Sequence, residues 1–145
     1  MRSIFSNWQV WALLSASFAA LTAIFAKGGA ENINPDFATF VRTVVVLLAL
    51  GAILVGTGQW VAPQSVSSRT YLFLILSGLA TGASWVCYFR ALQLGDVAQV
   101  APIDKLSVVL VALFATAFLG ERLSALNWLG IFLIAAGGLL VAQRA

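Results

Sequence analysis

The sequence predicts an all-α membrane protein built from five transmembrane helices, and three observations support this. Of the 145 residues, 61% are hydrophobic and only 9% are charged, whereas about a quarter of the residues of a water-soluble domain are charged. A helix that crosses a bilayer needs about 20 mostly apolar residues, and five such stretches follow one another along the chain. These stretches lack the apolar–polar alternation that strands of a membrane β-barrel require.

The predicted spans are separated by residues that favour helix ends. Gly28 and Gly29 are predicted to end the first span. We expect this span to be retained, because its apolar stretch is too long for a signal peptide. Asn34 and Pro35 resemble a helix N-cap and a first-turn proline, so they are predicted to begin the second span. The five spans form one domain of residues 1–145 and are predicted at residues 8–26, 35–60, 70–94, 97–119 and 125–142.

The start of the fourth span has two interpretations. Gly95 can end the third helix, and Asp96 to Gln99 fits a loose capping box for the fourth. With that start, Pro102 lies inside the helix, frees the carbonyl group of Ala98 and kinks the chain. If the helix begins at Ala101 instead, Pro102 is an ordinary first-turn proline. The pattern leaves both interpretations open.

The fifth span begins after two boundary residues. Gly120 can end the fourth helix, and Ser124 can cap the fifth. Within the fifth span, Gly130, Gly137 and Gly138 place small residues along one face. This face allows another helix, from the same subunit or from another one, to approach closely.

The residue inventory excludes several classes of function. The chain has no histidine and a single cysteine, Cys87. An intrachain disulfide, a Cys/His zinc site and a Ser-His-Asp triad therefore cannot be assembled. The eight basic residues are scattered over loops and helix ends and form no patch that could follow a phosphate backbone. We expect no enzymatic activity, no cofactor, no bound metal and no nucleic-acid partner.

Loop charges give no clear orientation in the membrane. Five spans place the two termini on opposite sides, and the positive-inside rule needs an excess of basic residues on one of them. Such an excess is missing, so a single fixed orientation and a dual topology, with copies inserted both ways, remain open. The N-terminal side holds Arg2, Arg69 and Arg122, and the opposite side holds Lys27 and Arg144, with Arg42 and Arg90 near helix ends.

Three charged residues lie within predicted spans at similar depths. Arg42 lies seven residues after Pro35, which is about 10 Å at about 1.5 Å per residue. Asp104 and Lys105 lie equally deep in the fourth span, which enters from the same side. Because a charge inside the bilayer costs roughly 3 kcal/mol, we interpret these residues as facing the interior, where an Arg42–Asp104 ion pair is geometrically possible. The alternative is that the basic chains extend to the headgroups; for Arg90, this or a structural salt bridge is the preferred interpretation.

The third span carries a polar stripe. Ser77, Thr81, Ser84 and Tyr88 fall on one helix face, with Trp85 beside them. This face is interpreted as the wall of a hydrated cavity, in which Trp85 and Tyr88 contact the cargo. It is equally interpreted as a packing face, because small and hydroxyl residues commonly join membrane helices.

Residues 85–123, with the segments APIDKLS and FLGERLS, resemble the EamA-type half of the drug/metabolite transporter superfamily. The segments FAALTAIFAKGG and DFATFVRT resemble the first two helices of the same family, so the likeness covers nearly the whole chain. It implies an EamA-like bundle and transport by alternating access. Full-length relatives have ten helices in two five-helix repeats of opposite orientation, and this chain resembles one repeat. The resemblance therefore implies an antiparallel homodimer.

Together these features predict a multi-pass secondary transporter of a small metabolite in the bacterial inner membrane, surrounded by lipid. Basic residues outnumber Asp104 within the spans, which favours an anionic or zwitterionic cargo. The first span carries no charge, so the glutamate mechanism of the related four-helix exporters is not transferred. The alternative is a non-transporting membrane subunit or assembly partner. The predicted substrate-binding residues are Arg42, Thr81, Ser84, Trp85, Tyr88, Asp104 and Lys105.

Overall fold

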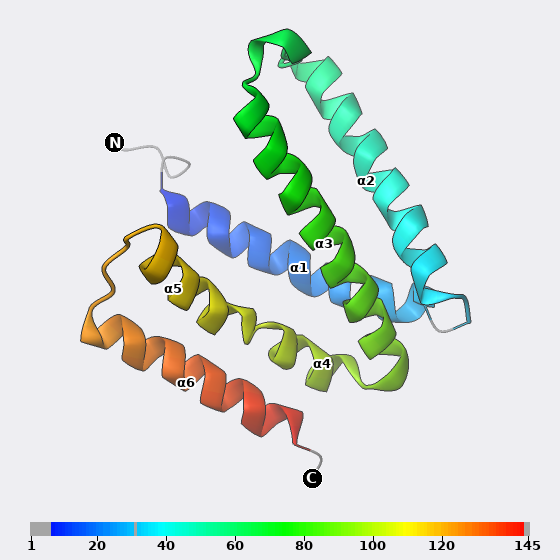
Figure 1. The fold of residues 1–145 in the computed structure, drawn as a ribbon. Helices are drawn as coiled ribbons and strands as arrows, with labels where there is room; N and C mark the ends of the chain where they lie inside the picture. The colour runs from blue at the N-terminus through cyan, green and yellow to red at the C-terminus, as the bar shows by residue number, and fades with distance from the viewer. Residues whose placement is uncertain (1–6, 31, 144–145) are drawn as a thin grey trace. The chain divides into compact units, whose positions relative to one another are not determined.

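The computed structural model of the chain describes residues 7–30 and 32–143, and these residues form helices and loops without strands. Arg2 and Arg144, which entered the comparison of loop charges, lie outside the described residues. The elements follow one another as shown in Figure 1. They are α1 (Trp8–Ala30), α2 (Pro35–Thr57), the short 3₁₀ helix η2 (Pro63–Ser65), α3 (Ser68–Leu94), α4 (Val97–Asp104), α5 (Ser107–Phe118) and α6 (Ala125–Ala142).

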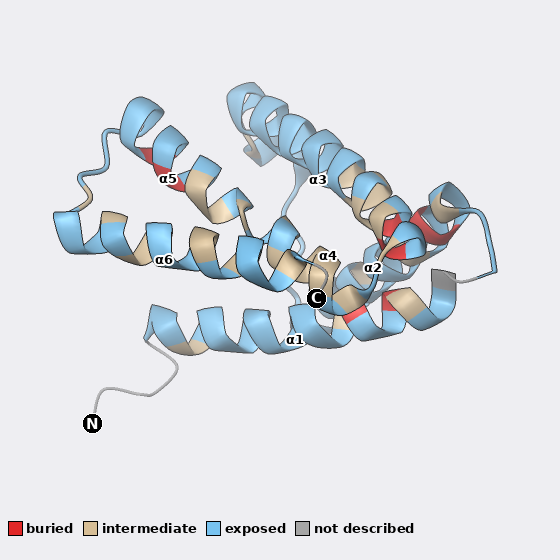
Figure 2. Cartoon of the chain, turned by 90° about the horizontal axis from the view of Figure 1, so that it is seen from below, coloured by how far each residue is buried: buried red, intermediate tan, exposed pale blue. Residues whose placement is uncertain are grey.

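Five helical stretches in the described residues are long and apolar enough to cross a membrane. Four of them are the single helices α1, α2, α3 and α6, and the fifth combines α4 and α5 over Val97–Phe118. Most of their residues are exposed in the isolated chain, as Figure 2 shows, which suits helices whose apolar side chains face lipid. The predicted fold class, an all-α membrane protein with five transmembrane helices, is confirmed.

The described residues divide into two compact units. The first contains residues up to Phe25 together with residues from Leu94 onward, and the second contains Ala26–Gln93. The two boundaries fall inside α1 and α3, so no linker separates the units. The assignment of residues 1–145 to a single domain stays a prediction.

Two predicted helix ends are wrong, and α3 begins at Ser68, two residues before the predicted start at residue 70. α1 continues through Gly28 and Gly29 to Ala30; a helical glycine weakens a helix but does not have to end it. α2 ends at Thr57 rather than at Trp60, because Gly58 adopts a left-handed conformation with φ of 67° and caps the helix. A glycine adopts this conformation at no steric cost. The glycine at position 58 therefore could have predicted this helix end from the sequence.

The predicted helix starts are correct at three positions, although one cap forms differently. The Asn34 side chain accepts hydrogen bonds from the backbone N–H groups of Asp36 and Phe37, and the Ser124 hydroxyl accepts one from Asn127. Asp96 is the N-cap residue of α4, but its side chain makes no capping hydrogen bond. The capping box therefore predicts the start of α4 correctly, but the predicted hydrogen bond from the Asp96 side chain is wrong.

The fourth span is interrupted, which decides between the two interpretations of Pro102. Pro102 lies inside α4 and has no N–H group for the carbonyl of Ala98. α4 ends two residues later, at Asp104, and Lys105 and Leu106 form a turn before α5 begins at Ser107. The prediction of one continuous helix over residues 97–119 is wrong at this turn, whereas the interpretation of Pro102 as a residue inside the helix, and not in its first turn, is confirmed.

Candidate functional site

Arg42 reaches from α2 to an aromatic surface on α3. Its guanidinium carbon lies 3.8 Å from the centroid of the Trp85 ring and 5.7 Å from that of Phe89. Trp85 and Phe89 are four residues apart, so they share one face of α3. Both distances are within the limit of about 6 Å for a cation–π interaction. Arg42 is half-buried, and its charge is therefore held against aromatic rings within the membrane-spanning part of α2.

Arg42 has no carboxylate partner among the described residues of its unit. Asp36 is the one carboxylate described there, because Glu31 lies outside the described residues. Asp36 is engaged by Arg90. Tyr88 is close enough to Arg42 to interact with it electrostatically. The positive charge of Arg42 is thus stabilised by aromatic groups, and no described carboxylate of this unit neutralises it.

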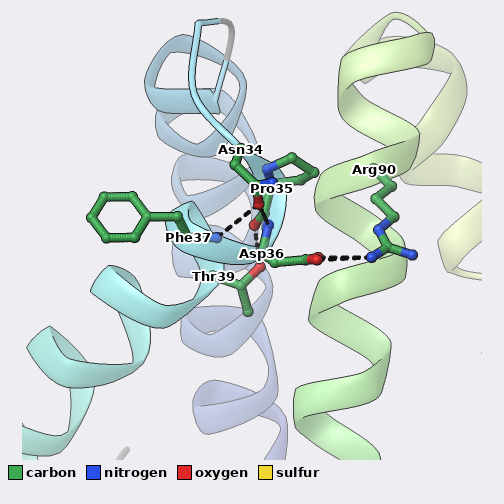
Figure 3. A network of polar contacts seen from close by, with 6 residues as sticks. All are labelled: Asn34, Pro35, Asp36, Phe37, Thr39 and Arg90. Carbon is green, nitrogen blue, oxygen red and sulfur yellow. Dashed lines mark hydrogen bonds and ion pairs between the residues drawn. The ribbon is translucent and has the colours of Figure 1, made fainter.

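The same two helices are joined at one end by an ion pair (Figure 3). Nη2 of Arg90 donates to both carboxylate oxygens of Asp36, at 3.0 Å and 2.9 Å. Asp36 is in the first turn of α2, directly after the Asn34 cap and Pro35. Both side chains are about half exposed, 58% for Arg90 and 52% for Asp36. This agrees with the interpretation of Arg90 as a member of a structural salt bridge.

Two further hydrogen bonds hold the last turn of α3. Nζ of Lys27 donates to the carbonyl oxygen of Leu92 at 2.7 Å, and Nε2 of Gln93 donates to the carbonyl oxygen of Ile33 at 2.8 Å. A lysine at a helix C-terminus satisfies free carbonyl groups and complements the helix dipole. Leu92 is fully buried and Phe89 nearly so. This anchored turn positions the aromatic face on which Arg42 lies.

The structure brings together only part of the predicted stripe. Trp85 and Tyr88 are half-buried beside Arg42. The hydroxyl of Thr81 donates to the carbonyl oxygen of Ser77 in its own helix at 2.9 Å, and Ser84 is exposed. Phe89 was not among the predicted site residues. Its spacing of four residues from Trp85 puts both rings on one helix face, and this spacing could have predicted its position beside Arg42. The substrate-binding role of each residue stays a prediction.

Asp104 and Lys105 lie in the other unit, at the interruption of the fourth span. Nζ of Lys105 lies 3.1 Å from Oδ2 of Asp104, so the two neighbours form an ion pair. The turn there is closed by hydrogen bonds between residues three apart, such as Leu106 N–H to the Ile103 carbonyl. The two residues of the predicted Arg42–Asp104 pair belong to different units, and that pair stays a prediction.

The interrupted span approaches α6 very closely. A Cβ atom built on Gly138 would lie 3.1 Å from the carbonyl oxygen of Pro102. This space is tighter than an ordinary van der Waals contact, so a side chain at this position would displace the backbone of α4. The prediction that the glycines of the fifth span permit close helix approach is confirmed at Gly138, whereas Gly130 and Gly137 face open space.

Among residues 7–30 and 32–143, no group of three or more His, Cys, Asp or Glu side chains lies together in a way that could hold a metal ion. The described side chains that form the contacts above are arginine, lysine, two paired aspartates, amide and hydroxyl groups and aromatic rings. This set can bind and orient a charged solute.

Comparison with known proteins agrees with this chemistry. The profile of the EamA-like transporter family matches residues 6–143. An uncharacterized transporter in the cobO 3'region of Sinorhizobium sp is 64% identical over 136 residues, which cover 94% of this chain and 96% of that protein. The uncharacterized transporter YxxF of Bacillus subtilis (strain 168) is 27% identical over 136 residues, which cover 93% of this chain and 42% of that protein. No solved structure matches the chain.

Proposed function

The chain belongs to the EamA-like transporter family, and from this premise we propose that it is a secondary transporter that moves a small anionic or zwitterionic metabolite by alternating access. It is a multi-pass bacterial membrane transporter. The observation that supports the finer proposal is Arg42, a cation within a membrane span that rests on Trp85 and has no carboxylate partner in the described part of its unit. A charge in such a place is expensive, and an anionic group of the cargo would neutralise it.

The proposed substrate site extends beyond Arg42. Trp85 and Tyr88 form its aromatic side, and Thr81 and Ser84 continue along α3. Asp104 and Lys105 contribute from the interrupted fourth span, because interrupted helices at membrane depth are tolerated where they line a cavity. The proposed site residues are Arg42, Thr81, Ser84, Trp85, Tyr88, Asp104 and Lys105.

We also propose that the working carrier is an antiparallel homodimer. The chain covers 42% of the Bacillus subtilis relative, so two copies together would cover most of the length of that longer protein. Five spans place the ends of one copy on opposite sides of the membrane, so two copies must insert in opposite directions to imitate an inverted repeat. The near balance of basic residues between the two sides allows both insertions.

Counterflow in proteoliposomes tests transport. Purified protein is reconstituted into vesicles loaded with unlabelled N-acetylphenylalanine or phenylalanine, an anion and a zwitterion that share one apolar body. We expect uptake of the matching labelled compound by the wild-type protein and its loss in Arg42→Gln and in Asp104→Asn. A folded wild-type protein that shows no counterflow of either compound, with variants that lose only stability, would instead favour a non-transporting subunit.

Orientation mapping tests the dimer. Single cysteines introduced near each terminus of a Cys87→Ser protein are labelled with a membrane-impermeant maleimide in intact cells. We expect both termini to be labelled in part, because copies lie in both orientations. Complete labelling of one terminus and none of the other would refute the antiparallel homodimer and leave the transport proposal standing.

A further inference from the structure

We infer that the Arg42 site recognises one carboxylate group on an otherwise uncharged small molecule with an apolar body. This inference rests on the proposed function, because it names the substrate class of the proposed site. It starts from a count of the charges in the unit that contains Arg42. Arg90 is neutralised by Asp36, and Lys27 donates to the Leu92 carbonyl at the end of α3. Among the described cations of α2 and α3, Arg42 is the one in the membrane interior whose charge no described carboxylate of this unit balances.

A single positive charge at Arg42 favours a ligand that carries one negative charge. A doubly charged phosphate group would need a second cation, whereas one carboxylate is neutralised by one guanidinium group. In a medium of low dielectric constant this difference is large, since an unbalanced charge is costly there. The unit that contains α4, α5 and α6 offers no surplus cation within its described spans either, because Lys105 is paired with Asp104.

The geometry of Arg42 also favours a carboxylate. With its guanidinium carbon 3.8 Å from the Trp85 centroid, Arg42 is at stacking distance. Stacking on an aromatic face uses the flat side of the guanidinium group and leaves its N–H donors, which lie in the plane, for a ligand. A carboxylate accepts two of these donors side by side in the same plane.

An ammonium group on the same cargo would find no free carboxylate among the described residues of this unit. Asp36, the one carboxylate described there, already accepts two hydrogen bonds from Arg90. Three aromatic side chains lie near Arg42, namely Trp85, Tyr88 and Phe89. An apolar or aromatic body attached to the carboxylate would lie against these rings, while the ammonium group of a zwitterion would lie near the positive charge of Arg42 with no described carboxylate of this unit to balance it.

A binding experiment on wild-type protein in lipid nanodiscs tests this inference without requiring transport. Four compounds are compared by calorimetry: N-acetylphenylalanine, its neutral amide, phenylalanine and phenyl phosphate. We expect N-acetylphenylalanine to bind about tenfold or more tightly than the amide, because the amide lacks a charge-assisted bond to Arg42. It should also bind more tightly than phenylalanine and phenyl phosphate.

A matched pair of variants assigns the preference to Arg42. Arg42→Gln should lose the preference for N-acetylphenylalanine over the amide, and Arg69→Gln should keep it. Arg69 is the control because it too lies over an aromatic ring, 5.8 Å from the Phe73 centroid, but is exposed at the start of α3. Helicity and monodispersity of both variants are checked first, and the wild-type ligand series stands even if Arg42→Gln does not fold.

The outcomes separate the inference from the transport proposal. Equal binding of acid and amide, tighter binding of phenylalanine or phenyl phosphate, or binding of none of the four would overturn the inference. Binding of the acid with the predicted preference but without counterflow would support the carboxylate site and contradict transport. Counterflow of phenylalanine alone would support transport and overturn the carboxylate site.

Discussion

Two arginines connect the same pair of helices in opposite directions, and their surroundings differ. Arg90 reaches from α3 to Asp36 at the start of α2, where both side chains are about half exposed and the charges cancel. Arg42 reaches from α2 to Trp85 on α3, deeper in the span, where aromatic rings stabilise the charge but do not cancel it. The comparison teaches that the partner of a charged residue in a span indicates its role. An arginine that is paired with a carboxylate joins two helices, whereas an arginine without a carboxylate partner can bind a charged cargo.

The largest effect is expected from reversing the charge of Arg42. Arg42→Glu should reduce counterflow of N-acetylphenylalanine by about 30-fold or more, because a carboxylate facing the cargo's carboxylate adds repulsion to the lost attraction. Arg69→Glu, at the exposed start of α3, is the matched control and should retain most of the activity. If both reversals reduced counterflow equally, the effect would come from the net charge of the protein and not from a site at Arg42.

A change of packing in the other unit provides a reference for stability. Gly138→Ala should lower the free energy of unfolding in mixed micelles by about 1–2 kcal/mol, since the new methyl group would press against the Pro102 carbonyl at 3.1 Å. Gly137→Ala in the same helix meets no atom within 4 Å and should be neutral or slightly stabilising. Equal stabilities of the two variants would contradict the close approach of α4 and α6.

The paired arginine depends on the helix start that presents Asp36. Asn34→Ala should lower the free energy of unfolding by about 1 kcal/mol, because two backbone N–H groups of α2 lose their acceptor. Asn34→Ser keeps a capping oxygen and should recover most of that loss. A full loss in Asn34→Ser would show that the amide group, and not the cap, is what stabilises this turn.

The smallest effect is expected at the ion pair. Asp36→Asn should cost about 0.2–1 kcal/mol of unfolding free energy, since exposed ion pairs contribute little. A double-mutant cycle with Arg90→Gln measures the interaction directly, and its coupling energy should lie in the same range. A coupling energy of zero would mean that the pair in Figure 3 does not stabilise the protein.

Much of the fold could be predicted because a bilayer imposes strong constraints on a sequence. Apolar stretches of spanning length give the five spans, and short-range chemistry gives the caps at Asn34 and Ser124. The ends at Gly28 and Gly29 were wrong because a glycine permits a helix end without requiring one. The interruption after Asp104 could be stated only as an alternative, because whether Pro102 distorts a helix depends on where that helix begins.

The candidate site was predictable in its residues but not in its pairings. The free-energy cost of placing a charge in the bilayer is enough to identify Arg42, Asp104 and Lys105 as candidates, because such a charge is usually kept only where it has a function. The partner of each charge depends on which helix faces lie together, and sequence periodicity leaves that undetermined. The positions of Trp85 and Phe89 next to the guanidinium group of Arg42 therefore came from the structure. The Asp104–Lys105 pair joins sequence neighbours, and the sequence analysis had sought the partner of Asp104 in Arg42 instead.

The central claim is that the cargo supplies the negative charge that balances Arg42. The most direct test makes the same substitution at Arg42 and at Arg90 and compares the results. Counterflow of N-acetylphenylalanine is measured for Arg42→Gln and Arg90→Gln in parallel, with the amount of folded protein matched. The account predicts a loss of about tenfold or more for Arg42→Gln and a change within about twofold for Arg90→Gln, because the latter breaks only an exposed ion pair. Equal losses in the two variants, or full activity in Arg42→Gln, would contradict it.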